Sequence, residues 1–443
     1  MPNDALERLL HLLRIPTVSS LDAAAVDLAQ FDRFIALLAE FYPITHEQLE
    51  RTVIAGHSLL FRWPGRGEAE PSVLMAHYDV VAAEPAGWTH PPFEPTVTGS
   101  GEDALLWGRG TLDDKGALVA IMEAVEEALA AGFVPRGDIY LCFGHNEEVA
   151  GDGAQAVVAE LQQRGVRPAF VLDEGGAVIE SMFPGLDRQV AVIGVSEKGI
   201  TTLELSVEQA GGHASSPPRI AATDRLARAL VRLSRRPFPV RLGAVSREML
   251  RRIGAQSRAP FDRIFRNAEA LALPLGLVLA RLGPDTNAMV RTTAAVTQLG
   301  AGLAANALPE RAWARVNIRI AVGSTLADVE RHVRRAINDG AVRIEVLDGA
   351  SDPSPVSAMS GPSWDRIASA VADSYADAVV VPYVMLGASD GRHFTAISPN
   401  VYRFTPFRMN AEIRGTLHAI DERIPLASWY RGIGFYRRII AES

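Results

Sequence analysis

Three short apolar runs, separated by segments with helical periodicity, constrain the fold of the first half of the chain. The runs cover residues 73–76, 139–143 and 169–172 and have the length and composition of buried strands. Residues 116–131 and 154–164 lie between them, and each helical segment is followed by a glycine suited to end a helix. This alternation predicts an α/β fold with a doubly wound, mostly parallel sheet.

Polar side chains follow each predicted strand at the point where it ends. His77 and Asp79 follow the first strand, Glu147 and Glu148 the second, and Asp173 the third. In open α/β sheets the carboxyl ends of the strands meet at one edge, where ligands bind. Each motif alone is also compatible with a structural histidine or a solvated acidic pair. Their coincidence at one edge predicts a functional site.

The composition limits the chemistry of that site. The 443 residues are 48% hydrophobic and 22% charged, which excludes a disordered chain and suits two or three domains. A formal charge of -8 argues against a nucleic-acid-binding surface, which needs clustered cations. Cys142 is the only cysteine, so neither an intrachain disulfide nor a thiolate zinc cluster can form. Any metal must therefore use imidazole and carboxylate ligands.

A further segment, residues 107–116, places Asp113 and Asp114 directly before a predicted helix. Its glycines match neither the dinucleotide fingerprint nor the P-loop. The two aspartates could simply cap the helix, but the predicted sheet puts them on the same edge as His77 and Glu148. Converging carboxylates repel one another unless a cation neutralises them. The set predicts a dinuclear hydrolytic centre, with zinc preferred and manganese or cobalt as possible substitutes.

The sequence pattern changes after about residue 195. Residues 201–207 and 312–320 alternate like half-exposed antiparallel strands, and residues 221–235 and 325–337 have helical periodicity. We therefore expect a smaller α+β domain, called the lid below, inserted between two parts of the first domain, which holds the predicted site and is called the catalytic domain below. The predicted limits of the first catalytic part, the lid and the second catalytic part are 1–195, 196–351 and 352–443.

Several motifs in order resemble the metallopeptidase family of aminoacylase, carboxypeptidase S and carnosinase. They are His77-Tyr-Asp79, residues 108–116 (GRGTLDDKG), Asn146-Glu-Glu148, residues 172–175 (LDEG), Gly212-His213 and a late His418. The resemblance runs essentially from end to end. Residues 172–176 and 196–199, with the long lid, most resemble the branch of carboxypeptidase S and the N-fatty-acyl amino acid hydrolases.

The resemblance implies a role for each metal ligand. One zinc ion would be held by His77 and Asp173, the other by Glu148 and His418, with Asp113 bridging both. Glu174 is an alternative to Asp173 as the metal ligand after the third strand, since some members of the family use the residue that matches Glu174.

The resemblance also implies the roles of the residues around the metals. Glu147 would be the general base that takes a proton from the bridging water and passes it to the leaving amine. Asp79 would orient His77 through its second ring nitrogen. The peptide bond between Asp113 and Asp114 would be cis.

The lid and the second catalytic part supply further candidates through the resemblance. His213 would hydrogen-bond the developing oxyanion in the opposite subunit of a dimer, although a turn histidine is the alternative. Arg319 would clamp a substrate carboxylate, whereas the strand pattern alone favours an exposed arginine. Asn306 matches a substrate-contacting lid position, and Ser389 lies in a segment resembling the loop that closes over the substrate.

These features predict a zinc-dependent hydrolase that cleaves the amide bond of N-acyl amino acids or the C-terminal peptide bond of short peptides. A dipeptidase or aminopeptidase of the same family is an alternative, and so is a catalytically silent binding protein with this fold. The apolar residues 270–282 in the lid suggest a hydrophobic acyl group, with core packing of a lid helix equally compatible.

We also expect a homodimer through the lid, because His213 would otherwise lie far from its own metals. The first residues lack the basic and apolar regions of a signal peptide, so a cytoplasmic location is expected. No apolar stretch reaches the roughly 20 residues that a bilayer requires, so no membrane partner is expected.

Overall fold

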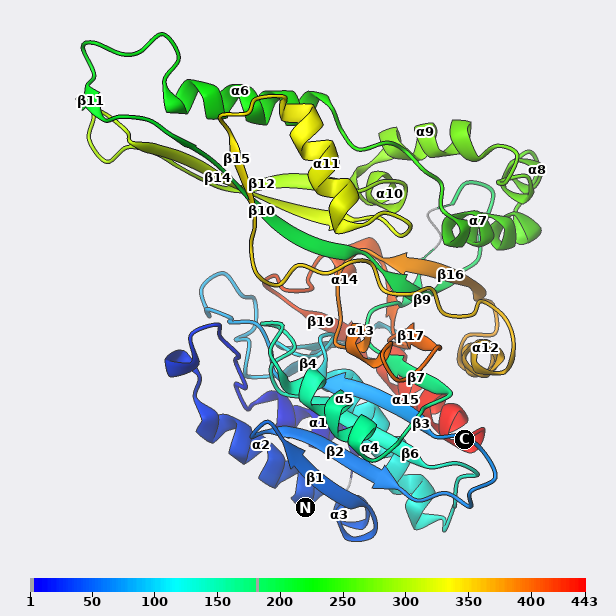
Figure 1. Cartoon of the computed structure of the whole chain (residues 1–443). Helices are drawn as coiled ribbons and strands as arrows, with labels where there is room; N and C mark the ends of the chain where they lie inside the picture. Colours follow the sequence, from blue (N-terminus) through cyan, green and yellow to red (C-terminus); the bar gives the residue numbers. More distant parts are fainter. Residues whose placement is uncertain (1–3, 181–182) are drawn as a thin grey trace.

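The computed structural model describes residues 4–180 and 183–443, which form two sheets with their helices (Figure 1). The larger sheet has ten strands and lies in the part of the chain that holds both termini. Its strands run in the order β1 (Glu50–Ile54), β2 (Ser58–Trp63), β6 (Ile139–Gly144), β3 (Ser72–His77), β7 (Phe170–Asp173), β17 (Val401–Arg403), β9 (Val190–Glu197), β8 (Val178–Ile179) and β18 (Arg408–Met409), with β16 (Val379–Met385) paired to β9.

The centre of this sheet is parallel, as the sequence predicts. Strand β3 pairs in parallel with both β6 and β7, and β7 pairs in parallel with β17. Antiparallel strands β1 and β2 extend one edge. The predicted strands at 73–76, 139–143 and 169–172 correspond to β3, β6 and β7, and the predicted α/β fold class is confirmed.

Helices cover both faces of the large sheet. Leu74 and Ala76 of β3 join a buried cluster with α4 (Lys115–Ala130) and α15 (Leu426–Ala441), whereas Val73 and Met75 pack in the cluster that includes α5 (Gly153–Gln163). Alternate side chains of a strand point to opposite faces of the sheet. Because helices cover both faces here, consecutive residues of the strand must all be apolar. The first cluster also involves α1 (Ala5–Leu13), α2 (Leu28–Phe41), α3 (Pro43–Gln48) and α12 (Pro362–Ser374).

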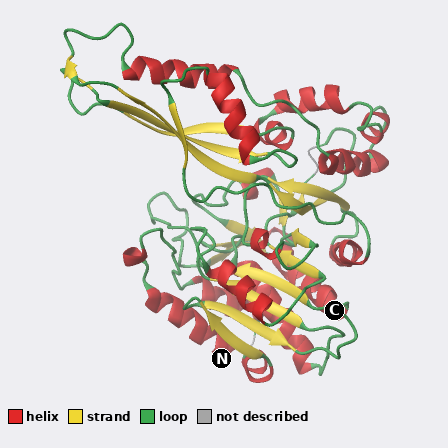
Figure 2. Cartoon of the chain, in the orientation of Figure 1, coloured by secondary structure: helices red, strands yellow, loops and turns green. Residues whose placement is uncertain are grey.

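The smaller sheet forms the core of the lid, which projects from the catalytic part (Figures 1 and 2). Its order is β12 (Thr293–Gly300), β14 (Arg311–Ile320), β10 (Gly199–Glu208) and β15 (Arg343–Val346). Helices α6 (Ala222–Arg235) and α11 (Leu326–Ile337) cover one face, where apolar residues of β10 and β14 are buried. Strands β11 (Gly212–His213) and β13 (Ala307–Leu308) pair at the far tip.

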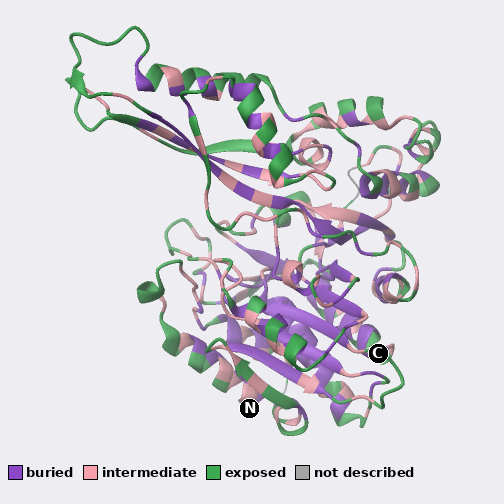
Figure 3. Ribbon diagram, in the orientation of Figure 1, coloured by how far each residue is buried: buried purple, intermediate pink, exposed green. Residues whose placement is uncertain are grey.

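A group of lid helices joins the lid to the large sheet. These helices are α7 (Ala244–Gln256), α8 (Phe261–Arg266), α9 (Ala272–Leu282) and α10 (Pro284–Met289). Met249, Leu250 and Ile253 of α7 share a buried cluster with strands β9 and β16. Figure 3 shows burial concentrated in the large sheet and exposure at the lid tip. The domain limits at 195 and 351 stay a prediction.

The remaining elements are short and lie in connections. They are β4 (Thr96–Thr98), β5 (Leu105–Trp107), β19 (Arg423–Pro425), α13 (Gly391–Phe394), α14 (Ala411–Arg414) and the 3-10 turns Ala23–Ala25 and Gly101–Asp103. Within the described ranges, no helix has the length and apolar character needed to cross a membrane.

Candidate metal centre

Four side chains from separate segments converge at the carboxyl edge of the large sheet. His77 ends β3, Glu148 follows β6, Asp113 precedes α4 and His418 follows α14. Asp113 Oδ1 lies 2.9 Å from His77 Nε2, and Asp113 Oδ2 lies 2.9 Å from His418 Nε2. His418 Nε2 is also 3.1 Å from Glu148 Oε2. Asp113 therefore directs one oxygen to each of two imidazoles.

The donors in this arrangement fit divalent metal ions. Ligand atoms of His77, Asp113 and Glu148, the metal-ligand group, all lie within 4.8 Å of one another. Glu148 Oε1 is buried and has no hydrogen-bond partner in the described part of the chain. Imidazole nitrogens and carboxylate oxygens without thiolate suit Zn2+ in a hydrolytic site. The metal-ligand group can therefore hold a metal ion, and the two oxygens of Asp113 suit a bridge.

The neighbouring carboxylates raise the pKa values of both imidazoles. Burial favours neutral His77, but hydrogen bonds to Asp113 and Asp79 raise its pKa well above its usual value. Hydrogen bonds to Asp113 and Glu148 raise the pKa of His418 to about 10. Imidazole binds a metal only in its neutral form, so a bound metal ion would take the place of these protons.

Asp79 lies directly behind His77, as expected of a residue that orients a ligand. It is fully buried, and His77 Nδ1 lies 3.0 Å from its backbone carbonyl oxygen and 3.3 Å from its Oδ1. Its two oxygens accept hydrogen bonds from the backbone N–H groups of Glu147 and Glu148, each at 3.1 Å, and one accepts from the Ser19 hydroxyl at 2.7 Å. Burial raises the pKa of Asp79, but the hydrogen bond and charge of His77 hold it below its usual value. One carboxylate thus fixes both an imidazole and the turn carrying two glutamates.

The loop that carries Asp113 depends on a residue that the sequence analysis did not identify. Glu422 is fully buried and accepts hydrogen bonds from the N–H groups of Gly110 at 3.1 Å and Leu112 at 2.8 Å. It also pairs with Arg109 at 2.6 Å. The peptide bond from Asp113 to Asp114 is cis, as the resemblance implied. The only sequence signal for Glu422 was its position shortly after His418.

The third strand brings two carboxylates to the same edge. Asp173 Oδ2 accepts a hydrogen bond from Gly391 N–H at 2.5 Å, and within the described residues the metal-ligand group does not include it. Glu174 instead lines the cavity described below, and burial raises its pKa well above its usual value. Ser389 is almost fully buried, and its N–H donates to Glu197 Oε2 at 2.7 Å. The choice between Asp173 and Glu174 stays open.

The predicted lid residues occupy two separate places. Arg319 lies on β14 and is partly buried, and burial followed by the charge of Arg392 lowers its pKa. His213 and Asn306 lie together at the exposed lid tip, where Ala214 N–H donates to the Asn306 carbonyl at 3.0 Å. Figure 1 places this tip at the far end of the lid from the large sheet. A single chain therefore does not bring His213 or Asn306 to the metal-ligand group.

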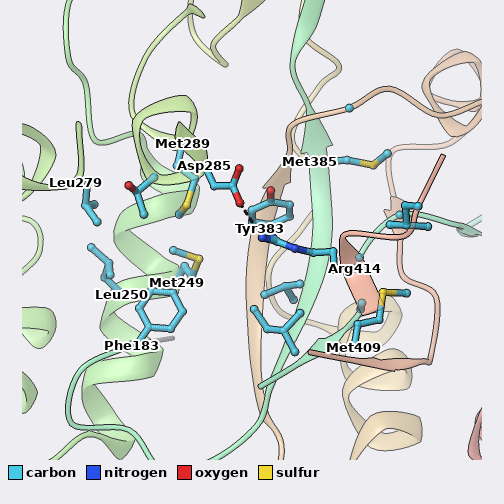
Figure 4. A pocket seen from close by; sticks show the side chains of 18 of the residues that line it. Phe183, Met249, Leu250, Leu279, Asp285, Met289, Tyr383, Met385, Met409 and Arg414 are labelled. Carbon is cyan, nitrogen blue, oxygen red and sulfur yellow. Dashed lines mark hydrogen bonds and ion pairs between the residues drawn. The ribbon is translucent and has the colours of Figure 1, made fainter. Parts of the chain in front are cut away.

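A cavity of about 730 Å³ borders the metal-ligand group. Asp113, Glu147, Glu174 and His418 form part of its wall. The remaining wall is mostly apolar and comes from α7 to α10, β16 and β18; it includes Phe183, Met249, Leu250, Leu279, Met289, Met385 and Met409 (Figure 4). Its volume lies in the range of pockets that enclose small organic ligands.

One ion pair crosses between the two parts of the chain in the wall of this cavity. Arg414 of α14 donates to Asp285 of the lid helix α10 at 2.8 Å, beside Tyr383 (Figure 4). Both charged side chains are about half exposed. This cavity is therefore built from the lid and the catalytic part together.

Comparison with known proteins agrees with this geometry. The chain is 35% identical over 416 residues to the probable carboxypeptidase S-like 2 of Dictyostelium discoideum, covering 93% of this chain and 79% of that protein. It is 34% identical over 447 residues to the N-fatty-acyl-amino acid synthase/hydrolase PM20D1 of Homo sapiens, covering 98% of this chain and 86% of that protein.

The solved structure of the M20 family metallo-carboxypeptidase Sso-CP2 from Sulfolobus solfataricus has the same fold. The TM-score is 0.72 at 16% identity, with 99% of each chain covered. Residues 73–442 match the family described as peptidase family M20/M25/M40. That match spans the strand ends carrying His77, Glu148 and Asp173, the inserted lid and the late His418, and the chain accordingly belongs to this metallopeptidase family.

Proposed function

We propose that this protein is a two-metal amidohydrolase that cleaves N-acyl amino acids with a hydrophobic acyl group. The 730 Å³ cavity, called the acyl cavity from here on, carries the proposal, because Asp113 and Glu147 lie in the same wall as a large apolar surface. A substrate amide at the metal-ligand group would place its acyl chain along α7 and α9. The substrate class in the name of the human relative supports the same choice.

For two zinc ions we propose the ligands His77 and Asp173 on one side, Glu148 and His418 on the other, and Asp113 as the bridge. The two 2.9 Å contacts from Asp113 to separate imidazoles support the bridging role. Glu174 is the alternative third-strand ligand. When bound, the ions would polarise the scissile carbonyl and lower the pKa of a water molecule; manganese or cobalt could substitute.

Glu147 is the group we assign to proton transfer. It lines the acyl cavity together with Asp113, and the hydrogen bond from its backbone N–H to Asp79 fixes its turn. As general base it would accept a proton from the attacking water and return it to the leaving amine. Asp79 would hold His77 in one orientation throughout.

Arg319 is our candidate for binding the free carboxylate of the substrate. A guanidinium can form two parallel hydrogen bonds to a carboxylate, and the partial burial of Arg319 would strengthen them. Ser389, in the segment over Asp173, is a further candidate contact. A substrate that lacks the free carboxylate would then be cleaved poorly.

We further propose a homodimer through the lid. Strand β12 is the edge of the lid sheet, and its Val296 and Leu299 are 49% and 67% exposed. An exposed apolar edge strand is a template for pairing with another chain. In such a dimer His213 and Asn306 of one lid tip would complete the site of the other subunit, with His213 donating to the developing oxyanion.

We also propose a cytoplasmic location. The one cysteine, Cys142, is buried and unpaired, so nothing in the composition requires an oxidising compartment. Subcellular fractionation of cells expressing the tagged chain would test this, and recovery outside the cytoplasm would contradict it.

A substrate panel with zinc-loaded protein tests the function. We expect N-dodecanoyl amino acids to be cleaved with higher kcat/KM than N-acetyl amino acids or dipeptides. A preference for polar dipeptides with a free amine would favour the dipeptidase or aminopeptidase alternative. Protein that takes up no metal and cleaves nothing would favour a silent binding protein.

The Glu147→Gln variant tests the mechanism separately. It should retain its metal content while kcat falls at least about 100-fold, because the proton acceptor is lost. Near-normal turnover in this variant would exclude Glu147 as the base. Elemental analysis of the same preparation separates a lost base from a lost metal.

A further inference from the structure

A second cavity of about 600 Å³ lies next to the acyl cavity. It is bordered by α7, α10, α11 and β16 and has not been used in the proposed reaction (Figure 1). Tyr383 and Met385 of β16 line the acyl cavity, whereas Val384 between them lines the second cavity. Alternate side chains of a strand point to opposite faces. Strand β16 therefore separates the cavities, and Met289 contributes to both.

Positive charge dominates the wall of the second cavity. Its cationic side chains are Lys198, Arg241, Arg291, Arg331 and Arg335, whereas Asp328 is the only carboxylate in the described lining. Asp328 is already paired with Arg331 at 2.7 Å. Arg241 and Arg335 form no ion pair with any described residue, and Arg291 Nε is buried without a hydrogen-bond partner there. The cavity thus holds unmatched donors suited to an anion.

The rest of the wall is apolar. Phe238, Val245, Met289, Val356 and Val384 all line it. Phe238 and Val245 are themselves buried, so the accessible apolar surface comes from Met289, Val356 and Val384. An inorganic anion would leave that surface uncovered, whereas a purely apolar molecule would leave the guanidinium groups unpaired. A ligand that satisfies both parts carries one negative group on a hydrocarbon chain. The cavity volume falls in the range that accommodates such a molecule.

We propose that the second cavity is a binding site for an amphipathic monocarboxylate. The carboxylate binds among Arg241, Arg291 and Arg335, and the hydrocarbon chain lies along Met289, Val356 and Val384. This site is distinct from the acyl cavity and does not depend on which amide the protein cleaves.

Isothermal titration of the purified full chain with dodecanoate, kept below micelle formation, tests the proposal. We expect two classes of site. Leu279→Trp fills the acyl cavity and should remove the class of site that lies there. Arg291→Gln combined with Arg335→Gln should weaken dodecanoate binding to the second cavity about tenfold or more, because charged hydrogen bonds are lost. Arg334→Gln is the matched control, because Arg334 lies on the same helix, pairs with Glu330 and does not line the cavity.

The outcomes separate the possible occupants. A single class of site that Leu279→Trp abolishes would overturn the proposal, and so would two classes that the arginine substitutions leave unchanged. Competition by inorganic phosphate as effective as that by dodecanoate would show a simple anion site and also overturn it. Arg335→Gln alone, at an exposed position, keeps the test valid if Arg291→Gln does not fold, and should weaken the same class about threefold or more.

Discussion

Glu422 offers a sharp test of how the metal-binding loop is held, and we develop it through Glu422→Gln. Both carboxylate oxygens of Glu422 are used: Oε2 accepts from Arg109 at 2.6 Å and from Gly110 N–H at 3.1 Å, and Oε1 accepts from Leu112 N–H at 2.8 Å. Glutamine keeps the shape but replaces one oxygen by an amide NH2. In either orientation of the amide, a donor therefore faces a donor.

The magnitude follows from the burial of the pair. The Glu422 and Arg109 side chains are 0% and 3% exposed, so Arg109 stays buried and charged after the substitution. Burial, and to a smaller extent the charge of Asp113, raise the pKa of Glu422 although Arg109 and the two backbone N–H groups oppose this. Breaking a buried pair costs about 3–5 kcal/mol, because the remaining charge has no partner. We expect a loss of that size, together with about 10–100-fold weaker zinc binding, since the loop presents Asp113.

Urea unfolding of the metal-free protein, followed by tryptophan fluorescence, measures the stability change, and competition with a chelator measures zinc affinity. Glu102→Gln is the matched control, because Glu102 pairs with Arg431 at 3.1 Å at exposed positions. That change should cost about 0–1 kcal/mol and leave zinc binding unaltered. If Glu422→Gln costs no more than the control, the loop is held by other contacts and the reasoning is wrong.

Three further predictions test the acyl cavity, the lid edge and the metal ligands. Leu279→Trp in the cavity wall should lower kcat/KM for substrates with long acyl chains but not for acetyl substrates. The control Leu273→Trp, on the exposed face of α9, should leave kcat/KM for both substrates unchanged. Equal losses for both substrates in Leu279→Trp would contradict the cavity assignment. Val296→Asp on β12 should give monomers with reduced activity in sedimentation and kinetic assays, whereas Val346→Asp on the opposite edge strand should not. The pKa of His418 in the metal-free protein is about 10, so zinc binding should release protons, and zinc affinity should rise between about pH 7 and 9. Calorimetry in buffers of different ionisation enthalpy measures the proton release. Zinc binding without proton release would contradict this prediction.

The sequence predicted the parts of the site that follow from strand topology. Buried parallel strands must end at one edge, so His77 and Glu148 could be placed together before their distances were known. The predicted sheet also put Asp113 at this edge, whereas His418 was added by resemblance, and the structure brings all four together. Whether each binds a metal stays a prediction.

The rest could not be predicted because no local pattern encodes it. Glu422 contacts the loop of Gly110 although more than 300 residues separate them in the sequence. A single buried acidic residue belongs to no periodic pattern or motif spacing by which the sequence could identify it. The apolar residues 270–282 fit a core helix and a cavity wall equally well, since both need the same helical stripe. Only the packing of α9 over the cavity shows that Leu275, Val278 and Leu279 face it.

The junction between the two parts of the chain links the lid to the third strand end. Glu197 ends β9, directly before the lid sheet begins at Gly199 with β10. Its Oε2 accepts from Ser389 N–H, and its Oε1 pairs with the fully buried Arg403 at 3.1 Å. Ser389 lies in the same short loop as Gly391, which binds Asp173. Glu197 therefore joins the start of the lid sheet both to the loop that contacts Asp173, through Ser389, and to the core of the large sheet, through Arg403.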